Sequence, residues 1–425
     1  MTRLLDIGIS GLTAHQTALA TTGHNIANAG VEGYSRQETI FATRQPTFTG
    51  DGFVGSGVGI QTIRRITNQF VVNQVITDTT RAAEIDVVSE GLEQLDQLLA
   101  DDNTGIATVL TSLFNSLQSA SESPTSIPLR QQVLSEAGRL VDRYQGIQGQ
   151  LDSLSTLSGQ VIVGVVDEIN ALANGIANVN QRIIDGKTFS TEDEVNDLLD
   201  QRDRLLRELA AKVSFSTIKQ DGESINVFIG GGQPLVLGAD TNRLVVADTQ
   251  ANSFEVGLFI DVNGRYTDIR GSVTGGVLGG HIKLREQGLA EVSSKLGLVQ
   301  TLLVHNVNTL HSQGVDLNGV QGGDLFTSLN DRDMQLARVL YPPGSASDNM
   351  VVSVAIDDPS ALVGSSYQFS MSGVGVFNYS LTRGSDGVVV KEGILPDVFP
   401  QTIEVEDGFS FTLESGSFAN GSEFT

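Results

Sequence analysis

Cysteine is absent from the 425-residue sequence. This absence excludes disulfide scaffolds, thiolate metal sites and cysteine nucleophiles, and it makes folding independent of the redox state of the compartment. No stretch of the chain approaches the roughly 18 uninterrupted apolar residues that a membrane-spanning helix requires. An unbroken apolar run is also missing near the start, where Asp6 interrupts the segment that a cleavable signal peptide would need. We therefore expect neither insertion into a membrane nor export by means of a cleaved leader.

Basic residues are scarce as well. The 26 lysines and arginines are outnumbered by 50 acidic residues, which gives a formal charge of −24. A chain of this sign is a poor partner for the phosphates of nucleic acid or for anionic lipid, so we expect it to bind neither nucleic acid nor a membrane surface. Because the chain is also too long for one ordinary hydrophobic core, we expect about two to four domains.

The first strong pattern is an apolar stripe with helical spacing near the start of the chain. Its positions are separated alternately by four and three residues: Leu5, Ile9, Leu12, Gln16, Leu19, Gly23 and Ile26. We predict that its five large apolar members form an assembly interface with partner helices. The alternative is that the stripe packs on the chain's own core, which is the commoner case for an arbitrary amphipathic helix.

Longer helical patterns follow, and β-rich regions interrupt them. Apolar residues keep a helical alternation over 140–183 without any proline, so we predict one long helix there. Helical spacing returns over 289–310, where Asn306 occupies a position on the apolar seam. Between these runs the period falls to two, with turn signals at 221–222 and 263–264. This order predicts a helical bundle that a β insertion interrupts.

Motifs for catalysis or ligand binding are weak. The sequence at 186–188 resembles the end of a phosphate-binding loop, but Gln181 stands where that motif requires glycine. A calcium loop that starts at Asp316 fails because its twelfth position is Thr327 and not an acid. The five histidines lack metal-ligand spacing, and no carboxylate pair stands out among the acidic residues. These residues therefore predict no enzyme activity, cofactor or metal, and a cell-wall hydrolase and an adhesin are the alternatives that stay open.

The most specific motif begins in the predicted N-terminal helix. Its residues are Asn25, Ile26, Ala27, Asn28, Gly33, Tyr34, Ser35, Arg36 and Gln37. The first part, together with residues 11–16, resembles the N-terminal signature of the flagellar axial family, which comprises rod, hook and hook-associated proteins. The second part resembles in particular the hook-associated proteins of the hook–filament junction. The resemblance implies a structural subunit of the bacterial flagellum at that junction, and a hook or rod subunit of the same family is the alternative.

The resemblance also implies how such a subunit would act. In the axial family the helices lie inward, the β-rich domains lie outward, and terminal helices pair to form an inner tube. The implied partners are other copies of the chain, hook subunits, filament-side junction subunits and the export apparatus, and the implied location is extracellular. The sequence at 416–425 resembles the interior of an outer domain and not the family's C-terminal helix, so we do not expect an export chaperone to dock through that helix.

These patterns divide the chain into six segments. We predict an N-terminal helix with its signature at 1–33, an extended or looped segment at 34–61, rod helices at 62–212, a β-rich insert at 213–280, a helical return at 281–335 and a second, incomplete β-rich domain at 336–425. The predicted fold class is α+β and multidomain, an elongated helical bundle rod with β-rich inserted outer domains.

Residues 2–27 are expected to be mobile in the free monomer and ordered on assembly. Burying five large apolar side chains contributes about 8–15 kcal/mol, whereas fixing the backbone of roughly 22 residues costs about 1–2 kcal/mol each. The helix alone is therefore marginal. Hydrogen exchange on the dilute monomer checks this expectation: the amides of 2–27 should exchange fast, and slow exchange would refute it.

Overall fold

The structure is a computed structural model that describes most of the chain. The described residues are 2–48, 52–100, 105–189, 192–220, 223–247, 254, 256–341, 349–374, 376–396, 398–417 and 419–425. They form two compact units, which we describe separately. Unit 1 consists of Met1–Val87, Ile162–Val246 and Leu258–Gly280, and unit 2 consists of Val88–Val161, Ala247–Gly257 and His281–Thr425.

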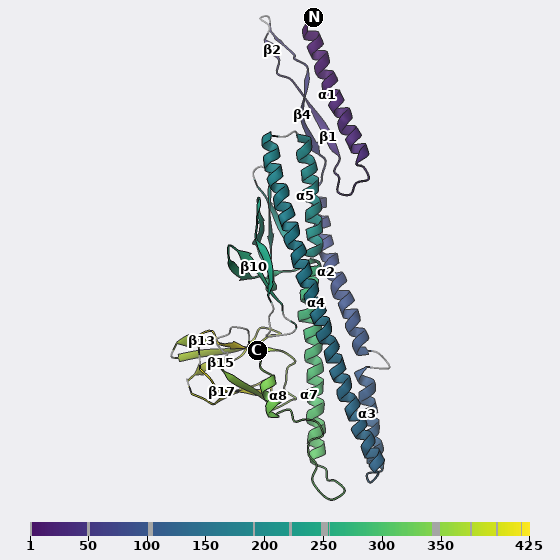
Figure 1. The fold of residues 1–425 in the computed structure, drawn as a ribbon, viewed down its shortest axis with the longest axis vertical. Coiled ribbons are helices and arrows are strands. Elements are labelled where there is room, and N and C mark those ends of the chain that lie inside the picture. Colours follow the sequence, from purple (N-terminus) through teal and green to yellow (C-terminus); the bar gives the residue numbers. More distant parts are fainter. Residues whose placement is uncertain are drawn as a thin grey trace. The chain divides into compact units, whose positions relative to one another are not determined.

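Unit 1 combines the N-terminal helix, a long hairpin, and two small sheets among helices (Figure 1). Its helices are α1 (Thr2–Ala27), the first part of α2 (Gln69–Ala100), the last part of α4 (Ile127–Phe189), α5 (Glu192–Lys212), η2 (Arg270–Ser272) and most of α6 (Gly276–Lys283). Its strands are β1 (Gln37–Thr43), β2 (Thr47–Phe48), β3 (Phe53–Val54), β4 (Val58–Arg65), β5 (Phe215–Lys219), β6 (Ile225–Ile229), β7 (Gln233–Leu237), β8 (Asp240–Thr241), β9 (Arg243–Ala247), β10 (Gly257–Val262) and β11 (Arg265–Asp268). Strand β1 pairs with β4 and β2 pairs with β3, and the two sheets have the orders β5-β6-β7-β8 and β11-β10-β9.

Unit 2 combines helices with a C-terminal β domain. Its helical elements are the rest of α2, α3 (Ile106–Glu122), the first part of α4, the π-helical turn η3 (Leu284–Leu289), α7 (Ala290–Ser312) and the short α8 (Arg332–Ala337). Its strands are β12 (Val351–Ile356), β13 (Tyr367–Val374), β14 (Val376–Arg383), β15 (Val389–Leu395), β16 (Gln401–Val405), β17 (Phe409–Ser415) and β18 (Glu423–Phe424). They form two sheets with the orders β12-β17-β16 and β15-β14-β13-β18.

The main helical predictions are confirmed. Helix α1 covers the N-terminal stripe, α4 covers the run at 140–183, and α7 covers the run at 289–310. In α4 the side chains of Leu140, Ile147 and Leu151 are almost fully buried, as their spacing predicts. Pro128 does not interrupt this helix. It is the second residue of α4, and amides of the first turn have no intrahelical partner to lose.

The start of the second helical region was predicted too early. Strand β4 continues to Arg65 and pairs with β1, and α2 begins only at Gln69. The pairing includes Thr62 opposite Ile40, so the residue expected to open the helix lies within a β ladder. A long-range strand partner, which local spacing does not reveal, decides this boundary.

The expected seam position of Asn306 is also wrong. Asn306 is exposed, and the buried asparagine of α7 is Asn308. The Asn308 side chain accepts hydrogen bonds from the amides of Leu325 at 3.0 Å and Phe326 at 2.9 Å. It also donates to the carbonyl of Phe326 at 2.8 Å. The buried amide therefore fastens the chain after α7 to that helix and does not face another helix.

The predicted alternation in the β insertion corresponds to strand β6 of unit 1, whose apolar positions are buried together with Asn226 between them. Ile225, Val227 and Ile229 of β6 are 7%, 0% and 2% exposed. The predicted turn at 263–264 joins β10 to β11, with a positive φ at both residues. The other predicted turn, at 221–222, lies outside the described residues.

The two C-terminal sheets of unit 2 enclose an aromatic core. Phe369, Phe411 and Phe424 come from different strands and are 0%, 1% and 5% exposed. The rings of Phe369 and Phe424 stack with centroids 4.4 Å apart, and Phe411 meets Phe369 edge-on at 5.6 Å. All strands of this domain, β12 to β18, lie within the segment 336–425 that was predicted to be β-rich.

A charge pair ties α8 to the sheet that contains β17. Both oxygens of Glu414 accept hydrogen bonds from the Arg332 guanidinium, and Ser353 donates to Glu414 at 2.6 Å. These hydrogen bonds, with that of Arg332 the strongest influence, lower the pKa of Glu414 to about 2. The ionised carboxylate therefore stabilises the folded β domain.

Replacing Glu414 with glutamine should make stability less dependent on pH. At neutral pH the variant Glu414→Gln should unfold at a lower temperature than the unmodified chain. A lowered carboxyl pKa contributes stability above the ordinary value of 4.5, and this contribution is lost as the pH falls toward about 2. The difference between the two melting temperatures, measured by calorimetry, should narrow across that window. A constant difference would contradict the role of Glu414.

Candidate assembly interface

Helix α1 packs on the β1–β4 hairpin through a narrow face of small and polar side chains. Ser10, Ala14 and Thr21 on this face are 4%, 3% and 8% exposed. The Ser10 hydroxyl accepts a hydrogen bond from the Val58 amide at 3.3 Å, and the Thr39 hydroxyl donates to the Thr21 hydroxyl at 3.1 Å. These contacts bring the helix close to the strands but bury little apolar surface.

The five large apolar side chains of the stripe lie on the opposite face of α1. At 100° per residue, the stripe and the packed face point in directions about 170° apart. The exposed fractions on the stripe are 65% for Leu5, 51% for Ile9, 62% for Leu12, 72% for Leu19 and 73% for Ile26. Figure 1 shows α1 lying along β1 and β4, which supply its principal contacts. The helix is amphipathic, but its polar face is the one that packs against its own unit.

The loop after α1 is folded back by Asn25. The Asn25 side chain donates to the carbonyl of Gln37 at 2.9 Å and accepts from the amide of the same residue at 2.8 Å. The Tyr34 hydroxyl donates to the same Asn25 oxygen at 2.8 Å. The side-chain amide thus makes the two hydrogen bonds that a neighbouring strand residue would make, and it fixes the place where β1 begins.

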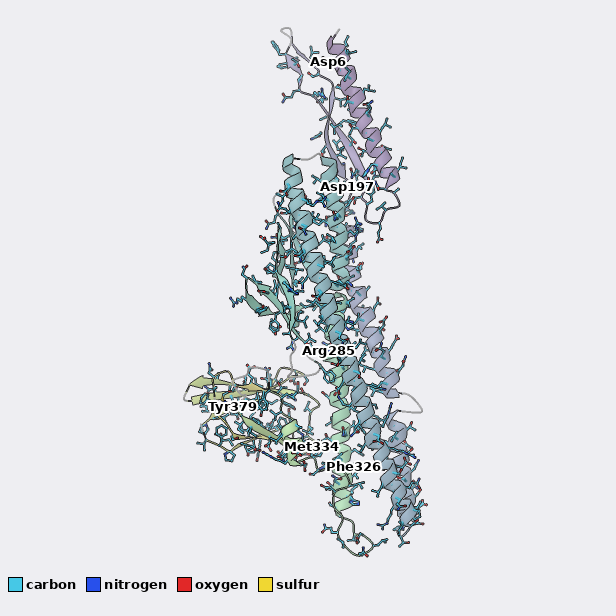
Figure 2. The ribbon with its side chains drawn as sticks, viewed as in Figure 1. Asp6, Asp197, Arg285, Phe326, Met334 and Tyr379 are labelled. Atoms are coloured by element: carbon cyan, nitrogen blue, oxygen red, sulfur yellow. The ribbon has the colours of Figure 1, made fainter. Side chains whose placement is uncertain are left out.

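Two aspartates of α5 accept hydrogen bonds from the signature residues Ser35 and Gln37. The Asp200 carboxylate accepts a hydrogen bond from the Ser35 amide at 3.0 Å. The Asp197 carboxylate accepts from the Gln37 side chain at 3.2 Å. Figure 2 labels Asp197 near the end of α5 that faces the loop after α1. The signature therefore contacts α5 as well as α1.

A buried arginine at the end of the hairpin forms salt bridges with aspartates of α5. Arg65, the last residue of β4, forms a salt bridge with Asp200 at 3.1 Å and another with Asp203. The side chains of Arg65 and Asp200 are 9% and 8% exposed. Because water screens this pair poorly, loss of Arg65 would leave the Asp200 carboxylate buried without it, and loss of Asp200 would leave Arg65 compensated by Asp203 alone.

Two glycines allow the chain to approach its neighbours closely. Gly33 has a φ of +83°, and a Cβ at this position would lie 2.6 Å from the Arg207 guanidinium. Gly57 has a φ of +87°, and a Cβ there would lie 2.1 Å from the Ser10 hydroxyl. Larger residues at either position would strain the backbone, and at Gly57 they would also push the hairpin away from α1.

The structure brings together only part of the predicted signature. Asn25, Tyr34, Ser35 and Gln37 form one hydrogen-bonded cluster, as described above. Ile26 belongs to the exposed stripe, and Ala27 is the last residue of α1. The Asn28 side chain is exposed and bonds to the His24 carbonyl at 3.0 Å. Arg36 contributes its carbonyl, which accepts from the Ile66 amide at 2.8 Å.

The acidic partners of the signature were not predicted from the sequence. Asp197, Asp200 and Asp203 are spaced by three residues, so they lie along one side of α5. That spacing was the available signal, but nothing local indicates that a segment 160 or more residues away would contact it.

The described residues include neither a candidate metal site nor a candidate membrane-spanning helix. Their His, Asp and Glu side chains include no group of three or more that could hold a metal ion. None of the helices in the described ranges is long and apolar enough to cross a bilayer.

Comparison with known protein families identifies the arrangement. Residues 92–326, more than half of the chain, match the model of the flagellar hook-associated protein FlgK helical domain. The chain belongs to the FlgK family. Residues 5–34, which hold α1 and the first part of the signature, also match the flagella basal body rod protein family.

Individual members of the FlgK family resemble the chain over nearly its whole length. Flagellar hook-associated protein 1 of Escherichia coli is 27% identical over 99% of this chain and 77% of its own length. The same protein of Salmonella typhimurium is 28% identical over 99% of this chain and 74% of its own length. The solved structure of the flagellar hook junction protein FlgK from Burkholderia pseudomallei is 25% identical, with a TM-score of 0.70 over 83% of this chain and 62% of that one. This member of the FlgK family is a structural protein of the bacterial flagellum, and its α+β fold with a long helical region is confirmed.

Neutralising Asp200 should loosen the signature more than neutralising Asp197. The variant Asp200→Asn leaves Arg65 buried with less compensation, which should lower the free energy of unfolding by about 3–5 kcal/mol. The matched variant Asp197→Asn changes a carboxylate that is 57% exposed, so the loss should stay below about 1 kcal/mol. Urea titration measures both. Equal losses would show that the buried pair does not anchor the loop.

Proposed function

We propose that the chain is a structural subunit of the junction between the flagellar hook and filament, and that it acts by self-assembly through α1 without catalysis. The observation that carries the proposal is the outward stripe of α1. A helix held to its own unit by small polar groups, with five large apolar side chains facing away, is built to be completed by other helices. The subunit would work outside the cell, on the flagellum.

The energy for assembly comes from covering this stripe. A large aliphatic side chain contributes about 1.5–3 kcal/mol when it is fully buried relative to full exposure. Four of the five stripe residues are more than 60% exposed, so most of this stabilisation is available to intermolecular contacts. Small residues on the packed face provide little compensation for ordering the helix. Folding of α1 would therefore be coupled to assembly.

The proposed partners follow from repetition of one subunit around an axis. Neighbouring copies would meet through different surfaces of α1, a heterologous contact that is repeated from copy to copy. Hook subunits would lie on one side of the resulting ring and filament-side junction subunits on the other. The names of the relatives, hook-associated protein and hook junction protein, support this placement.

A hook or rod subunit is the second candidate. The match of residues 5–34 to the rod protein family favours it, because this segment is shared within the axial family. The longer match of residues 92–326 to the FlgK helical domain favours the junction. Immunogold labelling of purified flagella separates the two: a single band between hook and filament supports the junction, and label along the rod or hook overturns it.

Charges on the stripe should abolish assembly without unfolding the subunit. In the paired variant Leu12→Glu/Leu19→Glu, two side chains that are 62% and 72% exposed become charged, so the soluble monomer should keep its thermal stability within about 0.5 kcal/mol. Cells that carry this variant in place of the natural gene should shed filaments and lose motility. The matched control Thr13→Glu places a charge on the exposed part of the same helix beside the stripe and should leave motility intact. Normal filaments on cells with the paired variant would contradict the proposal.

A further inference from the structure

Strand β12 forms one edge of the sheet β12-β17-β16 in unit 2. Its register against β17 pairs Val352 with Leu413 and Ile356 with Phe409. In an antiparallel ladder, alternate residues direct their backbone groups away from the partner strand. Val352, Val354 and Ile356 therefore direct their backbone N–H and C=O groups away from β17. These groups form the outer edge of the sheet.

Among the described residues, side chains close this edge, and the sheet has no further strand beside β12. The segment 330–341, which we call the edge cover, contains α8 and runs beside β12. The Asn330 side chain donates to the carbonyl of Ile356 and accepts from its amide, both at 2.8 Å. Arg338 donates to the carbonyl of Val354 at 2.9 Å. The Val352 amide donates to the Tyr341 hydroxyl at 3.1 Å.

The edge cover reproduces the hydrogen bonds of a strand without being one. Asn330 gives Ile356 the same pair of bonds that a directly opposed strand residue would give. Asn25 does this for Gln37 at the start of β1, and Asn170 does it for Leu244 of the outer strand β9, at 3.0 and 2.8 Å. The repeated use of one asparagine geometry indicates that closing exposed backbone is a general device in this chain.

The covered strand has a strong tendency to pair with copies of itself. Its sequence is Val-Val-Ser-Val-Ala-Ile over Val351–Ile356, with four β-branched aliphatic residues, no charge, no proline and no glycine. Segments of this composition associate edge to edge when their backbone is free. The Arg332–Glu414 charge pair and the hydrogen bond from Arg338 to the Leu329 carbonyl at 2.5 Å hold the cover in place.

We propose that the edge cover is an autoinhibitory strap over a latent strand-addition surface, and that the partner it excludes is β12 of a second copy. Two β12 edges would pair antiparallel about a two-fold axis, since each edge presents the same alternation of donors and acceptors. The cover keeps the β12 edges of two copies apart. This inference concerns unit 2 alone and does not depend on the proposed role of α1.

The test removes the hydrogen bonds that Asn330 and Arg338 make to β12 and leaves the sequence of the sheet unchanged. The variant Asn330→Ala/Arg338→Ala should give concentration-dependent dimers and larger species in light scattering after size-exclusion chromatography, under conditions where the unmodified chain stays monomeric. In the dilute variant the Ile356 amide, which loses its Asn330 acceptor, should exchange about tenfold faster or more, and association should restore its protection. The matched control Asn378→Ala changes an exposed asparagine of β14 and should do neither.

A second variant separates edge pairing from general unfolding. Val351 is 39% exposed on β12, so Val351→Lys adds a charge that opposes edge-to-edge pairing without restoring any hydrogen bond of the cover. Added to the double variant, it should return the protein to the monomer. Association that persists with this lysine would overturn the proposal, because unfolding would then be its cause. A double variant that stays monomeric at all concentrations would overturn it as well.

Discussion

The shallow packing of α1 against its own hairpin determines which face of the helix is left exposed. Ser10, Ala14 and Thr21 let the helix approach β1 and β4 closely, but they offer almost no apolar surface to the contact. These residues fix the packed face, together with the two hydrogen bonds between the Asn25 side chain and the backbone of Gln37, which we call the Asn25 bracket. The five large side chains of the stripe must therefore point away. A single choice of small residues on one side of a helix therefore creates the exposed stripe on the other side.

The signature residues have a physical role in this arrangement. They do not form the interface itself but position the helix that carries it, through the Asn25 bracket and the aspartates of α5. The buried Arg65–Asp200 pair connects the end of the hairpin to the same helix, so loop, hairpin and helix bundle of unit 1 are joined at one place. Asparagine brackets recur at Leu244 and Ile356, where they close the edges of sheets. The same side-chain geometry thus serves both to place α1 and to limit unwanted pairing.

Periodicity predicted those parts of the fold that depend on local sequence. The spacing of Leu140, Ile147 and Leu151 was sufficient to predict α4, and the alternation over 225–229 was sufficient to predict β6. The aspartate row of α5 and the burial of Asn308 in place of Asn306 were not predictable in this way, because their hydrogen-bond and salt-bridge partners lie outside the helix that carries them. For the site, the stripe was read from the sequence, but its outward direction became evident only from the packing of the opposite face. The division into six segments and the assembly role of the stripe remain predictions.

The absence of cysteine allows the central claim to be tested at single positions. A spin label on Leu19→Cys would report from the centre of the exposed face, and one on Thr13→Cys would report from beside it. Electron paramagnetic resonance spectra are compared for the free subunit and for flagella assembled with labelled subunits. If the stripe is the interface, the label at position 19 becomes strongly immobilised on assembly while the label at position 13 changes less. A label at position 19 that remains as mobile in the flagellum as in solution would show that the stripe is not the interface.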